Sequence, residues 1–250
     1  MRGSKYIQSE MRGVFPAVKD DLEAKRKVLF SGTSCQVAGL IGYLGKNYEN
    51  LFCVDIVCHG VPSPLVWKDY LRWQEKKNGS KVVGVDFRNK KDFGWKAHVE
   101  TLFLENGKQV DSRVFTTMFY GHSILRPCCY QCPYKDVIHP GDITIADYWG
   151  IEKAAPAFED AKGVSLVLVN NAHGRQLFDD TSDRFDYVQT RIEDSMQKPL
   201  IGPYDPPKSR EQFWKDSRNK GFSIIAKKYG GYGLFAAIKR KARRFLKRVK

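Results

Sequence analysis

Short apolar runs alternate with amphipathic segments in the first part of the chain. Residues 27–32 and 51–57 are apolar runs typical of buried strands, and residues 36–44 between them follow helical spacing. The apolar stripe of this helix consists of Val37, Leu40, Ile41 and Leu44. A strand, a helix and a strand in this order form a β-α-β unit, which predicts a parallel pair with a right-handed crossover.

A second predicted helix covers residues 64–76, with Ser63 as N-cap and Pro64 in the first turn. Its predicted buried face is formed by Trp67, Tyr70 and Leu71. Further strands are expected at 82–87, 142–147, 164–170 and near 185–189, with helices at 115–125 and 174–180.

A hairpin is predicted where residues 97–104 and 110–115 flank the turn sequence Glu105-Asn-Gly-Lys108. A crossover unit together with a hairpin indicates an α/β fold with α+β character. We expect a mixed sheet with a parallel β-α-β start, flanking helices, the hairpin and a loop carrying a cysteine knuckle.

Composition narrows the class of protein. The chain has 250 residues, is 42% hydrophobic, and shows no signal peptide and no apolar run of the roughly 18 residues that a membrane span needs. A cytoplasmic location is therefore expected, where grouped cysteines bind metals more often than they form disulfides. No arrangement of Ser, His and Asp or of paired carboxylates indicates a hydrolase.

Four of the six cysteines are candidate metal ligands. Cys129 and Cys132 form a C-x-x-C knuckle, while Cys35 and Cys58 each follow a predicted strand. If those strands are parallel, both cysteines lie beyond carboxyl ends at one edge of the sheet, where α/β sheets bind ligands. Cys53 lies five residues before Cys58, roughly 16 Å away along a strand at about 3.3 Å per residue, and is expected to be a core thiol.

Spacing alone leaves three interpretations of these cysteines open. They bind an iron–sulfur cluster, they bind zinc, or they are incidental buried thiols. Cys128 adjoins Cys129 and leaves the register of the knuckle open, although the two-residue spacer of Cys129 is the commoner ligand loop.

Five segments in order resemble one known family: FSGTSCQVAGL at 30–40, VCHGVPSP at 57–64, FRNKKDFGWK at 87–96, LRPCCYQC at 125–132 and GDITIADYWG at 141–150. The chain from Gly3 to about Asn170 resembles the C-terminal domain of the coenzyme F420 hydrogenase/dehydrogenase beta-subunit family. The resemblance implies an iron–sulfur flavoprotein that carries FAD and [4Fe–4S] clusters and passes electrons between a partner and a deazaflavin coenzyme. It also implies that Cys35, Cys58, Cys129 and Cys132 are cluster ligands.

The chain departs from the family pattern at several points. The pattern usually has Pro where this chain has Ser34, and Ser where it has Cys128. Full-length members also carry an N-terminal ferredoxin-like region. This chain is expected either to be truncated or to lack this region, so that a ferredoxin-like donor or acceptor is an expected partner. Bacterial relatives are often encoded with surface-polysaccharide genes.

Other residues near these motifs are candidates for cofactor binding. The turn of Ser31, Gly32 and Thr33 offers backbone N–H groups to a cluster or a phosphate, or is an ordinary strand-to-helix turn. A second set suits a phosphate or a reduced flavin, or is a solvated basic turn; it consists of Arg88, Lys90, Trp95 and Lys96.

Two residues are candidate catalytic groups. His59, next to Cys58, is a candidate hydrogen-bond donor or proton shuttle, and Asp147 is a candidate to orient a flavin or a cluster loop. A structural role in a turn or a cap is the alternative for each.

Charge is concentrated at the C-terminus. The chain has a net charge of +14, and IKRKARRFLKRVK at 238–250 contains eight Lys and Arg and no acid. Apolar residues recur there at helical spacing, which fits an anionic membrane surface. Nucleic acid is a second option, although no nucleic-acid module accompanies the tail, and a solvated, partly disordered end is the other alternative. A peripheral position at the inner membrane face follows as an expectation.

The function predicted from these features is that of an iron–sulfur flavoprotein oxidoreductase subunit. A zinc-stabilised binding module without catalysis is the alternative, and a cluster-bearing fragment that needs a ferredoxin partner is a third. The predicted domains are a cofactor-binding domain at 1–192, a helical extension at 193–237 and the basic tail at 238–250.

Overall fold

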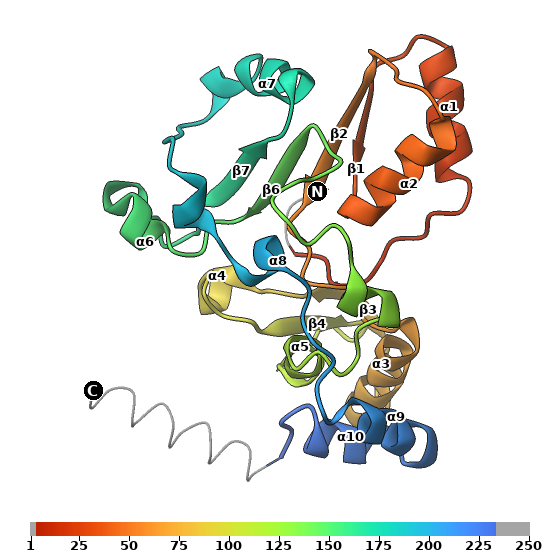
Figure 1. Ribbon diagram of the computed structural model, residues 1–250. Helices are drawn as coiled ribbons and strands as arrows, with labels where there is room; N and C mark the ends of the chain where they lie inside the picture. The colour runs from red at the N-terminus through yellow and green to blue at the C-terminus, as the bar shows by residue number, and fades with distance from the viewer. Residues whose placement is uncertain (1–3, 234–250) are drawn as a thin grey trace. The chain divides into compact units, whose positions relative to one another are not determined.

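The computed structural model describes residues 4–233, which form two compact units (Figure 1). The four-stranded unit comprises residues 9–59 and 131–204, and the three-stranded unit comprises residues 4–8, 60–130 and 205–233. Each unit is therefore built from segments that are remote in the chain. The domain boundaries expected at residues 192 and 237 stay a prediction, and the basic tail lies outside the described residues.

The four-stranded unit has a mixed sheet in the order β1-β2-β6-β7. β1 and β2 are parallel, β2 and β6 are parallel, and β6 and β7 are antiparallel. The predicted parallel β-α-β start is thus confirmed. The strands are β1 (Val28–Ser31), β2 (Leu51–Ile56), β6 (Ile143–Asp147) and β7 (Ser165–Val169), and the helices are α1 (Val14–Glu23), α2 (Ser34–Leu44), α6 (Ile151–Ala154), η2 (Pro156–Phe158), α7 (Ala172–Asp179), η3 (Ser182–Arg184), η4 (Ile192–Ser195) and α8 (Lys198–Ile201).

Alternation along β2 directs its side chains to two covered faces. Leu51 and Cys53 join the apolar core under α1 and α2. Phe52, which points to the other face, stacks on His173 of α7 with ring centroids 4.1 Å apart. Helices therefore cover both faces of this sheet, as expected for strands in a parallel arrangement.

The three-stranded unit has an antiparallel sheet in the order β3-β4-β5. The predicted hairpin is confirmed as β4 and β5, although it belongs to this separate sheet. The strands are β3 (Val82–Asp86), β4 (Glu100–Leu104) and β5 (Gln109–Ser112), and the helices are α3 (Pro64–Asn78), α4 (Lys90–Phe93), α5 (Val114–Tyr120), η1 (Pro127–Gln131), α9 (Arg210–Asn219) and α10 (Phe222–Lys228).

An aromatic core holds the three-stranded unit together. Tyr70 of α3, Phe115 of α5 and Phe213 of α9 are all fully buried in one cluster. The carboxylate of Glu100 lies in this interior and accepts hydrogen bonds from the backbone N–H groups of Phe115 (3.0 Å) and Thr116 (3.2 Å). Burial raises the pKa of Glu100 because the charged form is removed from water.

The buried face predicted for α3 is correct in part. Tyr70 is fully buried, whereas Trp67 and Leu71 are partly buried against the core, and Val66 and Gln74 complete the buried face. Pro64 occupies the start of the helix and Ser63 the N-cap, as predicted.

Two other predicted elements differ from the structure, and one helix was not predicted. No strand occurs at 185–189, where Phe185 and Tyr187 instead form an aromatic cluster with Phe178 of α7. The helix expected at 115–125 ends at Tyr120, because Ile124 and Arg126 form backbone hydrogen bonds with residues 61–63. The sequence patterns also failed to indicate α1. Among residues 4–233, every helix is too short or too polar to cross a membrane.

Candidate functional site

Cys35 lies in the first turn of α2. This helix begins at Ser34, two residues earlier than predicted, and Thr33 and Gln36 form a capping box at its start. The Cys35 side chain is exposed, and its Sγ lies 3.1 Å from the Thr33 hydroxyl. The first turn of a helix favours negative charge, so this position suits a thiolate that binds a metal.

The turn of Ser31, Gly32 and Thr33 is less available than the sequence indicates. The Gly32 N–H donates to the Val54 carbonyl at 3.2 Å, and the Thr33 N–H donates to the Gln36 side chain at 2.9 Å. Two of the N–H groups proposed for a phosphate or a cluster are therefore used within the protein.

Cys58 follows β2 and is tied to the segment that carries Cys132. The buried Lys135, three residues after Cys132, donates from its Nζ to the His59 carbonyl at 2.8 Å. The His59 ring lies against Tyr204 at 4.5 Å, and the Lys135 ammonium lies 4.7 Å from the centre of the same tyrosine ring. These contacts hold the loop after Cys58 and the loop after Cys132 together within the four-stranded unit.

The other half of the knuckle belongs to the three-stranded unit. Cys129 lies in η1, and its Sγ accepts a hydrogen bond from the Val61 backbone N–H at 3.4 Å. Hydrogen bonds of this kind to sulfur tune the potentials of iron–sulfur centres. Cys128 is exposed.

The six cysteines differ in burial. Cys53 is buried, as predicted for a core thiol, and its pKa is raised to about 12 by burial and by Asp142 and Asp55. Cys58, Cys129 and Cys132 are half-buried. Among residues 4–233, no group of three or more His, Cys, Asp or Glu side chains is arranged to hold a metal ion, so the predicted ligand set stays a prediction.

The predicted basic segment is partly an interior structure. Arg88 and Trp95 are both buried, and the Arg88 guanidinium donates to the Trp95 carbonyl. Lys96 places its ammonium 5.5 Å from the centre of the Trp95 ring, and Lys90 begins α4. Arg88 and Trp95 therefore brace this loop, and their role in cofactor binding stays a prediction.

Asp147 ends β6, as predicted. Its backbone carbonyl accepts a hydrogen bond from the Gln197 side chain at 3.2 Å, which joins the strand end to the segment before α8. The catalytic roles predicted for Asp147 and for His59 stay predictions.

Sequence reasoning missed a buried polar cluster at the start of α2. The His139 Nδ1 lies 3.1 Å from both the Asp55 carboxylate and the Ser34 hydroxyl, and Thr144 donates to the other oxygen of Asp55 at 2.5 Å. His139 and Asp55 are separated by 84 residues, so no local motif identifies them. Ser34 occupies the position where the family pattern has Pro, and this departure is the one available signal.

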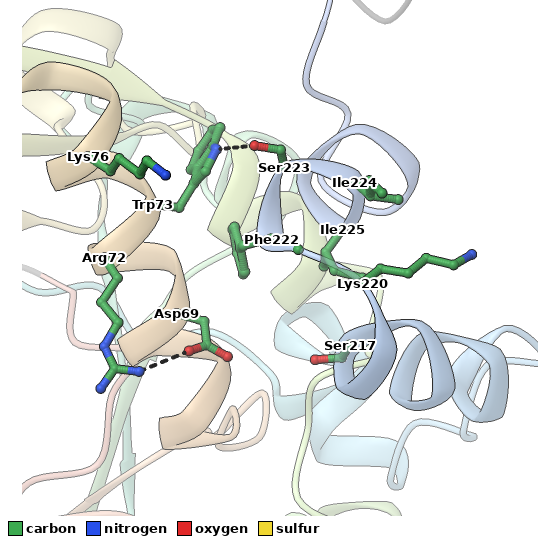
Figure 2. Close-up of a pocket in the computed structure, with 11 residues that line it drawn as sticks. Asp69, Arg72, Trp73, Lys76, Ser217, Lys220, Phe222, Ser223, Ile224 and Ile225 are labelled. Atoms are coloured by element: carbon green, nitrogen blue, oxygen red, sulfur yellow. Dashed lines mark hydrogen bonds and ion pairs between the residues drawn. The ribbon is translucent and has the colours of Figure 1, made fainter.

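A groove of about 600 Å³ lies in the three-stranded unit between α3 and the segment of α9 and α10 (Figure 2). Trp73 donates from its indole N–H to Ser223 at 3.0 Å across this groove, and Arg72 pairs with Asp69 at 3.5 Å on its α3 side. No residue of the predicted site lines it.

The fold is that of an α/β protein with a mixed four-stranded sheet, and four of its cysteines lie in motifs that follow one another in a fixed order along the chain. The chain belongs to the family described as the C terminus of the beta subunit of coenzyme F420 hydrogenase/dehydrogenase, whose model matches residues 25–194. The predicted family is thereby confirmed, and its name is that of an oxidoreductase subunit.

Other comparisons add little. The chain is similar to a chain in the xenon-derivatised structure of the F420-reducing [NiFe] hydrogenase complex from Methanosarcina barkeri, with 15% identity and a TM-score of 0.47 over 88% of this chain and 72% of that chain. No curated protein matches the sequence.

Proposed function

We propose that this chain is an iron–sulfur flavoprotein subunit that transfers electrons between a [4Fe–4S] cluster and a flavin or deazaflavin of the coenzyme F420 type. The observation that carries the proposal is the family match, because residues 25–194 contain all four predicted ligand cysteines. Their accessibility supports it, since none of the four is fully buried.

Cys35, Cys58, Cys129 and Cys132 would bind the cluster. When bound, a cluster supplies single electrons and a flavin exchanges two. Lys135 fixes the loop after Cys58, and the Val61 N–H is a donor to the Cys129 sulfur. FAD and coenzyme F420 are the proposed further cofactors, with Arg88, Lys90, Trp95 and Lys96 as the proposed binding segment.

Anaerobic purification followed by iron, sulfide and flavin analysis tests the proposal. We expect brown protein with a broad visible band, acid-labile sulfide in an amount equal to iron, and bound flavin. The Cys58→Ser variant should lose most of its iron, whereas Cys128→Ser, a matched control beside a proposed ligand, should keep it. Colourless protein that contains zinc would overturn the proposal in favour of the zinc-stabilised binding module.

A ferredoxin-like donor or acceptor is the proposed partner, and a role in surface-polysaccharide biosynthesis is the proposed setting. Addition of a reduced ferredoxin to the flavin-loaded protein should bleach the flavin spectrum. The proposed location is cytoplasmic and peripheral to the inner membrane face.

A further inference from the structure

A pocket of about 310 Å³ lies in the three-stranded unit, at the start of α3. It is lined by Ser63, Pro64, Leu125, Arg126, Pro127, Arg210 and Trp214. Two of these residues are arginines, and none is an acid. The lining therefore carries a charge of about +2 and contains no acidic residue.

Arg210 is held rigidly at this pocket. Its guanidinium donates to the Ser123 carbonyl at 2.6 Å and to the Tyr130 hydroxyl at 3.0 Å, and it lies over the rings of Tyr130 and Trp214 at 4.9 and 5.6 Å. All of these partners are neutral groups. The contacts orient the side chain and leave its charge uncompensated.

Arg126 places a second guanidinium group at this pocket. Its backbone N–H donates to the Val61 carbonyl at 2.9 Å, and this fixes the position of the residue. Its half-buried side chain makes no hydrogen bond or ion pair with any residue from 4 to 233. A guanidinium has five N–H donors in a planar fork, so its whole donor set faces the pocket or solvent.

Two further residues that line this pocket, Trp214 and Ser63, each carry a neutral donor. The indole N–H of Trp214 is buried and has no hydrogen-bond partner among the described residues. The side chain of Ser63, the N-cap of the 15-residue helix α3, does not cap the first-turn N–H groups of that helix. An uncapped helix start adds a positive field to the two arginines.

We propose that this pocket binds the phosphate group of a dissolved organic phosphate. Planar guanidinium forks match phosphate oxygens geometrically, and two of them balance the nearly double negative charge of a phosphate monoester at neutral pH. The unpartnered indole N–H and the Ser63 hydroxyl supply neutral donors for the remaining oxygens. The inference is independent of the proposed electron transfer, because it needs neither iron nor flavin.

Isothermal titration calorimetry on the 250-residue chain tests it with inorganic phosphate, with ADP as a phosphate ester and with citrate as an anion that has carboxylates only. We expect both phosphate compounds to bind in preference to citrate. Arg126→Gln should weaken phosphate binding about tenfold, as expected for loss of a charge-assisted contact. Trp214→Phe, which removes the N–H and keeps an aromatic ring, should weaken it about threefold.

Arg72→Gln is the matched control, because Arg72 belongs to α3, whose start lines this pocket, but itself lines the other groove. It should leave phosphate affinity unchanged, and thermal melts should show that each variant is folded. Equal loss of affinity in Arg72→Gln and Arg126→Gln would mean binding by general surface charge and would overturn the proposal. Unchanged affinity in both Arg126→Gln and Trp214→Phe, or tighter binding of citrate, would also overturn it.

Discussion

Burial divides the cysteines into thiols with opposite expected reactivity. Cys53 is buried in the core under α2 and has a pKa raised to about 12, so it is a neutral thiol at every physiological pH. Cys35 and Cys128 are exposed. Only a thiolate reacts rapidly with an alkylating reagent, and access limits that reaction further.

We predict that iodoacetamide at pH 8 modifies Cys35 and Cys128 first in metal-free protein. Cys53 should react only after unfolding in urea, which serves as the internal control. Peptide mass spectrometry gives the order directly. Modification of Cys53 in the folded protein at the rate of Cys128 would contradict the buried position of this thiol.

Asp216 of α9 is a buried acidic residue that is held by two lysines and a tyrosine. Its buried carboxylate meets the Lys228 ammonium at 2.7 Å, the Lys220 ammonium at 2.9 Å and the Tyr229 hydroxyl at 2.8 Å. Lys228 and then Lys220 and Tyr229 hold the pKa of Asp216 below its usual range. A lowered carboxylate pKa stabilises the fold at a pH above the unfolded pKa of about 4, and this contribution is lost as the pH falls toward the folded pKa.

The Asp216→Asn variant should therefore have a lower melting temperature than the parent at pH 7. The difference should narrow as the pH falls below about 4, where the parent loses the same contribution. Circular dichroism melts of both proteins from pH 7 to pH 2.5 measure it. A difference that stays constant over this range would show that the ion pairs do not stabilise the fold.

At the scale of elements, α7 depends on one glycine. The Gly174 N–H donates to the Asn171 side chain at 2.7 Å at the start of the helix, and a Cβ on Gly174 would lie 2.0 Å from the Asp142 carbonyl oxygen. Because the clashing oxygen belongs to the backbone of Asp142, a Cβ on Gly174 could be accommodated only if α7 moved away from the sheet. The absence of a side chain here is a condition for the packing of this helix.

We predict that Gly174→Ala lowers the free energy of unfolding by about 2 kcal/mol or more. Gly42→Ala in α2 is the matched control, because a Cβ there meets no atom within 4 Å. This control should raise the free energy of unfolding by about 0.5–1 kcal/mol through helix propensity. Urea denaturation of the two variants decides, and equal effects would refute the close approach at Gly174.

Most strands and helices could be predicted from the sequence because each is specified by residues that are close together in the chain. The apolar runs that became β1 and β2 and the Asn-Gly turn between β4 and β5 each lie within a few residues. The strand expected at 185–189 failed because alternation does not specify a partner strand, and its aromatics found Phe178 instead. The separation of the hairpin into its own sheet is likewise decided by distant contacts.

At the scale of the whole molecule, we expect the basic C-terminus to favour association with anionic surfaces. Residues 238–250 carry eight Lys and Arg and no acid. We predict that the full chain co-sediments with phosphatidylglycerol vesicles and that a chain ending at Ala237 loses most of this binding. Raising the salt concentration should weaken binding through screening. Equal co-sedimentation of both chains would remove the proposed membrane association.

Long-range assembly also limits what the sequence reveals about sites. The four cysteines could be proposed as ligands from spacing and resemblance because each lies in a recognisable segment, and their role stays a prediction. The pair of His139 and Asp55, and the pocket formed by Ser63, Arg126, Arg210 and Trp214, join residues from distant segments. Only the folded chain brings such groups together, so pattern reading gives no access to them.

The discontinuous make-up of the three-stranded unit has a consequence for synthesis. Tyr70 and Phe115 leave the ribosome well before Phe213 and Ile225, which complete their shared core. A nascent chain that stops at residue 204 therefore lacks the residues that cover this aromatic surface. We expect such a chain to bind chaperones and to aggregate. Expression of the three-stranded unit alone would require its three chain segments to be joined, because no single continuous stretch of the sequence encodes it.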